Sequence, residues 1–171
     1  SSSFFGASVL KPGYTEILME YSEVLFLLSE ANGWSQSYYE QGVRASMEKW
    51  NIDSAKINAF VAALPPANKQ NVLTQKYVSL FMQPFEAWAE YRRTGYPNTL
   101  LLPGQSAALN VATASGQTTY TFTSLIADLT DLPTRIYYPT TVQTLNTDNY
   151  NAASTAIGGD KMNTKLIWDK N

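Results

Sequence analysis

The chain has 171 residues, of which 44% are hydrophobic and 15% are charged, and its formal net charge is −2. This composition is typical of a folded segment, long enough for one sizeable core or for part of a larger one. The weakly negative charge argues against a nucleic-acid partner, because such a partner requires a basic stripe on the protein.

The sequence contains neither cysteine nor histidine. Disulfides, cysteine metal sites and thiol nucleophiles are therefore excluded within this chain, as are the Ser-His-Asp arrangement and the usual zinc ligand. No apolar run approaches the roughly 18–20 residues that a helix needs to span a bilayer. The first residues, SSSFFGAS, lack the basic and apolar regions of a signal peptide. Because cysteine and histidine are missing, we expect neither a cofactor nor a metal site.

Two amphipathic helices are expected at the start of the chain. The first covers about 14–31 and ends at Asn32-Gly33 by turn chemistry. Its apolar stripe is predicted to comprise Ile17, Leu18, Tyr21, Val24, Leu25 and Leu28. The second covers about 37–50, and Ser37 followed by Glu40 indicates a capping box at its start. Its inner face is predicted to comprise Tyr39, Val43, Met47 and Trp50.

Two further helices follow. A shorter one covers about 53–64 and is closed by Pro65-Pro66. A longer one begins near Asn68 and ends near Arg93, before the stop signal of Gly95 and Pro97. Its interior proline, Pro84, predicts a kink or a local break, since an interior proline costs about 3 kcal/mol.

The character of the sequence changes after Pro97. Residues 98–171 are rich in Thr, Asn and Gly and lack a long helical period. The stretch 110–124 indicates a β-hairpin around a Ser115-Gly116 turn, and one short helix is expected near 149–156. We therefore expect a helical region over 1–97 and a loop-rich wrap over 98–171, together forming one part of a larger domain.

Several stretches match, in order, the motifs of one known family. They are YSEVLFLLSEANGW (21–34), YYEQGVRASMEKWNI (38–52), EAWAEYRRTGYP (86–97), PTRIYYP (133–139), NYNAA (149–153) and GGDKMNTKLIWD (158–169). These stretches resemble the C-terminal half of the SusD/RagB-like outer-membrane lipoproteins of Bacteroidota. The resemblance covers roughly residues 12–170.

The resemblance implies a mainly α fold of tetratricopeptide-like antiparallel helix pairs, followed by a long irregular C-terminal region with a short β-hairpin. It also implies the C-terminal portion of a longer protein, so we expect an N-terminal portion that is missing or lies on another chain. The implied location is the cell surface of the outer membrane, with a lipid anchor on a segment absent from this chain.

The function implied by the resemblance is nutrient binding without catalysis. An oligosaccharide, or less often a peptide, is captured for import through a TonB-dependent SusC-like barrel. Two alternatives stay open: a helical-repeat scaffold that binds another protein without a small ligand, and a glycosidase, since carboxylates alone can perform that chemistry.

Aromatic residues on expected loops are the candidate ligand contacts, because sugar rings stack on aromatic faces while polar groups hold the hydroxyls. These candidates are Trp34, Tyr38, Tyr96, Tyr137 and Tyr138. Each of them could instead pack at a helix corner or anchor the tail. The family motifs transfer no binding residue, because its ligand surface lies largely in variable loops.

Five residues are expected to be structural: Trp88, Arg92, Arg93, Asp160 and Asp169. The arginine pair could bind an anionic ligand, but the stronger interpretation is that one arginine pairs with Asp160 or Asp169 of the tail. Glu90 is expected to support Arg93 at i+3, which weighs against Glu86 and Glu90 as a catalytic pair. Asp128 and Asp131 could face a ligand or calcium, although turn capping is the default for both.

Overall fold

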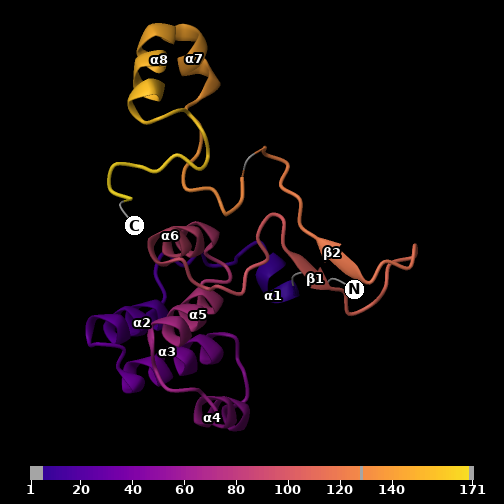
Figure 1. Cartoon of the computed structure of the whole chain (residues 1–171). Coiled ribbons are helices and arrows are strands. Elements are labelled where there is room, and N and C mark those ends of the chain that lie inside the picture. The colour runs from indigo at the N-terminus through magenta and orange to yellow at the C-terminus, as the bar shows by residue number, and fades with distance from the viewer. Residues whose placement is uncertain (1–5, 128, 170–171) are drawn as a thin grey trace. The chain divides into compact units, whose positions relative to one another are not determined.

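The computed structural model describes residues 6–127 and 129–169. Contacts divide the chain after Ala87 into two compact units, residues 1–87 and 88–171. Helices dominate the described residues, and the sheet found among them has two antiparallel strands (Figure 1). The predicted mainly α class with a short hairpin is confirmed.

The first unit is helical. Its helices are α1 (Ala7–Leu10), α2 (Tyr21–Ala31), α3 (Gln36–Lys49), α4 (Ser54–Ala62) and α5 (Lys69–Ser79), and α6 (Pro84–Thr94) begins in this unit. Helices α2, α3 and α5 all contact one another, and α4 contacts α3 (Figure 1). The short connection between α2 and α3 makes them a helical hairpin, an antiparallel pair of the kind that the family resemblance implies.

The core of this unit lies where α2, α3 and α5 meet. It consists of Phe26, Tyr39, Val43 and Val72, each at most 2% exposed. The rings of Phe26 and Tyr39 are 6.5 Å apart. Trp34, Met47, Val61, Leu64 and Ala67 pack around this cluster. Apolar burial on this scale is the main stabilising term for such a helical hairpin.

Helix α2 differs from its prediction in length and in its buried face. It begins at Tyr21 rather than near residue 14, and Leu18 and Tyr21 are 90% and 69% exposed. The buried residues are Ser22, Glu23, Leu25, Phe26 and Ser29, so Leu25 of the predicted stripe is buried together with Phe26 and with polar side chains that the stripe did not include. Ser29 is fully buried, and its polar groups are satisfied: its Oγ donates to the Ser35 carbonyl, and its own carbonyl accepts the Trp34 N–H, which closes the turn to α3.

The predicted capping box at the start of α3 is wrong. The N-cap is Ser35, whose side chain makes no capping hydrogen bond, and Ser37 lies inside the helix. Glu40 instead accepts a hydrogen bond of 2.8 Å from the Gln36 side chain. Side-chain caps occur at the next two helices, where Asp53 caps α4 and Asn68 caps α5.

The expected disturbance at Pro84 is a complete break. Helix α5 ends at Ser79, and α6 starts with Pro84 as its first residue, the position at which the missing proline N–H costs nothing. Helix α6 ends at Thr94, and Gly95 follows with a φ of +73°, a conformation that glycine adopts without a steric penalty.

The second unit holds a hairpin and a helix pair. Strand β1 (Ser106–Ala108) pairs with β2 (Thr119–Thr121) in antiparallel register, with Ala107 opposite Tyr120. The first strand lies before the predicted stretch 110–124, while Gly116 occupies the turn with a φ of +80°. Helix α7 (Thr140–Leu145), which the sequence does not predict, packs against α8 (Thr147–Ala156), which covers the predicted helix near 149–156.

Candidate functional site

Helix α6 directs its two adjacent arginines into different environments. The Arg93 Nη2 pairs with the buried Glu90 Oε1 at 2.8 Å, which confirms the predicted i+3 pair. The Arg92 guanidinium lies 4.7 Å from the centre of the Trp88 ring. The Trp88 Nε1 donates to the Pro133 carbonyl at 2.6 Å, which fixes the orientation of the indole. Within the described residues, Arg92 is therefore positioned by stacking on Trp88 and has no carboxylate partner.

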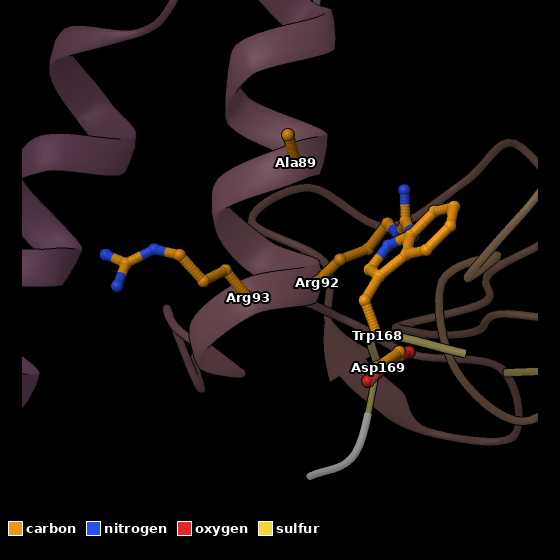
Figure 2. A pocket seen from close by; sticks show the side chains of 5 residues that line it. All are labelled: Ala89, Arg92, Arg93, Trp168 and Asp169. Atoms are coloured by element: carbon orange, nitrogen blue, oxygen red, sulfur yellow. The ribbon is translucent and has the colours of Figure 1, made fainter. Parts of the chain in front are cut away.

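A pocket of about 280 Å³ opens beside Arg92 (Figure 2). Its lining residues are Ala89, Arg92, Arg93, Trp168 and Asp169. Trp168 is 70% exposed, whereas the Asp169 side chain is 13% exposed and lies 4.0 Å from the Lys165 Nζ. Figure 2 shows the Arg93 guanidinium pointing away from Trp168. The pocket thus combines an accessible indole, the Arg92 guanidinium and a carboxylate.

The predicted pairing of Asp160 with an arginine of α6 is wrong. Asp160 Oδ1 instead accepts a hydrogen bond of 2.7 Å from Arg135 Nη1, and both side chains are almost fully buried. The Tyr138 N–H and the Tyr150 hydroxyl also donate to the Asp160 carboxylate. Arg135 lies within the PTRIYYP stretch, so the ion pair joins two segments that follow α6.

This network also sets the electrostatics of Tyr150. Burial, then the negative charge of Asp160 and the hydrogen bond to it, raise the pKa of the Tyr150 phenol above its ordinary value of 10.0. The Tyr138 ring stacks under the Arg135 guanidinium at 4.6 Å and meets the Tyr150 ring edge-on at 6.1 Å. Tyr138, a predicted ligand contact, is therefore held within this network.

A second, smaller pocket of about 120 Å³ lies in the same unit. Its lining residues are Ile126, Ala127, Leu129, Tyr137, Lys161, Met162 and Asn163. Tyr137, another predicted ligand contact, is 42% exposed. An aromatic ring, an amine and an amide around an apolar floor are the groups with which a sugar residue is held.

The remaining predicted ligand contacts lie apart from these pockets. Trp34 packs against the core of the first unit and adopts a φ of +66°, and Tyr38 in the same unit is half-buried. Tyr96 follows α6 in the second unit, and its N–H donates to the Thr94 hydroxyl. Of the five predicted ligand contacts, Tyr137 is the one found among the described lining residues of these two pockets.

The acidic residues considered for catalysis or calcium have other surroundings. Glu86 is exposed, and Glu90 is buried with Arg93. Asp131 Oδ1 accepts from the Tyr91 hydroxyl and from the Leu132 N–H, as a turn carboxylate does, while Asp128 lies outside the described residues. Within 6–127 and 129–169, no three acidic side chains gather as metal ligands would.

None of the helices described within 6–127 and 129–169 has the length and apolar character to cross a bilayer.

Sequence reasoning passed over Arg135, Lys161 and Trp168. All three lie inside stretches that carry the family resemblance, PTRIYYP and GGDKMNTKLIWD. Trp168, next to an acidic residue in a polar tail, was the available signal, because an indole offers a large flat surface together with an N–H donor.

The comparisons with known proteins agree with one another. A protein-family model described as SusD-like, starch-binding associating with outer membrane, matches residues 4–121. A solved structure described as a Bacteroidetes AC2a SusD-like protein aligns with a TM-score of 0.69 and 31% identity over 91% of this chain. A second, described as a chitin-binding protein, aligns with a TM-score of 0.64 and 29% identity over 88% of this chain.

These alignments cover 30% and 33% of the two solved chains, so this chain spans about a third of their length. No curated protein matches the chain. The family model covers well over half of the sequence. The chain belongs to the SusD-like family of starch-binding proteins that associate with the outer membrane.

Proposed function

We propose that this chain is part of a cell-surface protein that captures oligosaccharides for import without catalysing a reaction. The captured ligand is handed to a TonB-dependent SusC-like transporter, and a lipid anchor outside this chain holds the protein at the outer membrane. Peptides are the second ligand class for such a role.

The observation that carries the proposal is the family match over residues 4–121. The chitin-binding description of one structural neighbour points to the same ligand class for that protein. Because this chain spans about a third of its neighbours, the transporter partnership and the ligand remain properties proposed for the whole protein.

The geometry supports a sugar contact at the pocket lined by Tyr137, Lys161 and Asn163. A pyranose ring can lie against the phenol, while the amine and the amide serve its hydroxyls. The pocket is small, about 120 Å³, so it suits the end or the edge of one sugar unit rather than a whole oligosaccharide.

The test is a titration of the protein with a panel of neutral oligosaccharides derived from starch and chitin, followed by tryptophan fluorescence and calorimetry. We expect saturable binding of at least one oligosaccharide and no release of reducing sugar. Binding with release of reducing sugar would replace the proposal with a glycosidase. Absence of any response across the panel, with the protein folded, would favour a scaffold that binds protein.

A pair of tyrosine variants tests the pocket itself. Tyr137→Ala should weaken oligosaccharide binding by about tenfold, as the loss of one stacking contact does. Tyr120→Ala is the control, because Tyr120 on β2 is similarly exposed, at 47%, and lines neither described pocket of this unit. Equal effects of the two substitutions would remove Tyr137 from the site.

A further inference from the structure

We propose that the pocket lined by Arg92, Trp168 and Asp169 is a subsite for a sugar unit that carries a carboxylate, such as a uronic acid. The proposal rests on the proposed function, since it assumes a saccharide ligand. It adds the chemical class of that ligand and a second place on this chain at which it binds.

The charge of Arg92 is the feature of the pocket that favours an anionic ligand. Among the described residues, no carboxylate pairs with this guanidinium, and its Nε is buried without a hydrogen-bond partner. Stacking on Trp88 fixes the side chain but satisfies none of its N–H donors. A guanidinium stays charged, so a pocket that holds it with unused donors favours an anionic group.

The neighbouring charges do not cancel this preference. Arg93 is matched by Glu90 at 2.8 Å, and its guanidinium points away from Trp168 in Figure 2. Asp169, the carboxylate among the described lining residues, lies 4.0 Å from the Lys165 Nζ, which offsets part of its charge. Among the described residues that line the pocket, Arg92 therefore supplies a positive charge that a ligand can neutralise.

The indole of Trp168 is the surface of the pocket on which a sugar ring can lie. The indole is 70% exposed at the pocket, so its face is accessible to a sugar ring. A sugar ring on the indole leaves its carboxylate free to meet Arg92, and Asp169 can accept from a hydroxyl. The volume of about 280 Å³ lies close to the lower limit of about 300 Å³ for small-ligand sites, so it suits one sugar unit.

The discriminating experiment is calorimetry at low salt with a short oligogalacturonide and with its carboxyl-reduced, neutral counterpart. The two ligands differ in their carboxylates alone. The wild-type protein should bind the acidic form at least about tenfold more tightly, because the guanidinium–carboxylate bond is charge-assisted. Added salt should narrow this difference.

Two substitutions of Arg92 test whether this residue causes the preference for the acidic oligomer. Arg92→Gln should abolish it, so that both oligomers bind with similar affinity, and Arg92→Lys should restore only part of it because lysine lacks the planar fork. Arg44→Gln is the matched control, since it removes one arginine charge from α3, where Arg44 bonds Asn58. Circular dichroism melting confirms that each variant is folded.

Trp168→Ala keeps the proposal testable if Arg92 variants fail to fold, because an exposed side chain can be truncated at little cost to stability. It should weaken binding of both oligomers. Equal affinity of the wild-type protein for the two oligomers, or a preference that survives Arg92→Gln, would overturn the subsite. In that case, binding of the neutral panel would leave the proposed function standing. Absence of all glycan binding would remove both.

Discussion

Asp160 joins the segment that follows α8 to the PTRIYYP stretch and to α8 itself, and no periodic pattern in the sequence indicates these contacts. Its carboxylate receives hydrogen bonds from the Arg135 side chain, the Tyr138 N–H and the Tyr150 hydroxyl. Arg135 and Asp160 are 6% and 3% exposed at the side chain, so water contributes little to either charge. Each charge therefore depends on the other.

Loss of the buried cation should destabilise the second unit. We expect Arg135→Ala to lower the free energy of unfolding by about 3–5 kcal/mol, because Asp160 is left as a buried, unpaired carboxylate. Urea denaturation followed by fluorescence measures the change. Arg44→Ala removes an exposed hydrogen bond to Asn58 and should cost no more than about 1 kcal/mol. Similar losses for both variants would contradict the account of the pair.

Because of Tyr150, the free energy of unfolding should decrease as the pH rises in the alkaline range. Its pKa is raised in the folded state, so the folded protein holds the phenolic proton more tightly than the unfolded chain does. This contribution is fully present below the ordinary pKa of 10.0 and is lost as the pH rises through the folded-state pKa. Ultraviolet titration of the wild type minus Tyr150→Phe should show a phenol that ionises above 10.0 when folded. A difference curve that is the same in the folded and the denatured protein would contradict this.

At the scale of elements, periodicity predicted helices well where an apolar face decides the packing. Helices α3 and α4 lie within two residues of their predicted bounds because their apolar residues recur at helical spacing. The buried face of α2 was predicted in part: Leu25 is buried as expected, while Phe26 and the small, polar Ser22 and Ser29 lie at the contact in place of the other predicted residues. Hydrophobic patterning does not register side chains that are buried for their small size.

Part of the candidate site was predictable and part was not. The exposed Tyr137 was predicted to contact a ligand because of its residue type; it lines a pocket, and its contact with a ligand stays a prediction. The Arg135–Asp160 pair and the meeting of Arg92 with Trp168 join residues that are distant in the sequence through irregular segments. No local period encodes such contacts, and helical spacing alone gives no partner for a loop residue.

The contact between α2 and α3 requires glycine at position 42. A Cβ placed on Gly42 would lie 2.9 Å from the Phe26 ring, and Phe26 is 1% exposed and cannot move aside. We expect Gly42→Ala to destabilise the first unit by about 1–3 kcal/mol, although alanine favours helices elsewhere. Gly13→Ala is the control, because no atom lies within 4 Å of its added Cβ. Thermal melting distinguishes the two, and a stabilised Gly42→Ala would contradict the packing.

Two N-caps that look alike in sequence should differ in energy. Asp53 accepts hydrogen bonds from the N–H groups of Ala55 and Lys56, whereas the Ser35 side chain caps nothing. Asp53→Ala should therefore cost about 1 kcal/mol and Ser35→Ala only a few tenths. Urea denaturation of both variants measures the difference, and equal costs would show that the caps are not distinguished by their side-chain bonds.

At the scale of the whole molecule, the structure divides inside α6, after Ala87. The predicted division into a helical region over 1–97 and a wrap over 98–171 of a larger domain remains a prediction. The family match fixes the relationship of the chain, while its pockets supply the chemistry from which a ligand is inferred. Both pockets described above are lined by residues that follow Ala87, in the second unit.

The most direct test of oligosaccharide capture for import is native mass spectrometry of the protein purified from its source membrane in mild detergent, with and without added oligosaccharide. The account predicts a complex with a SusC-like transporter whose mass increases by that of the bound oligosaccharide. A folded protein that runs without a transporter and takes up no oligosaccharide would contradict it.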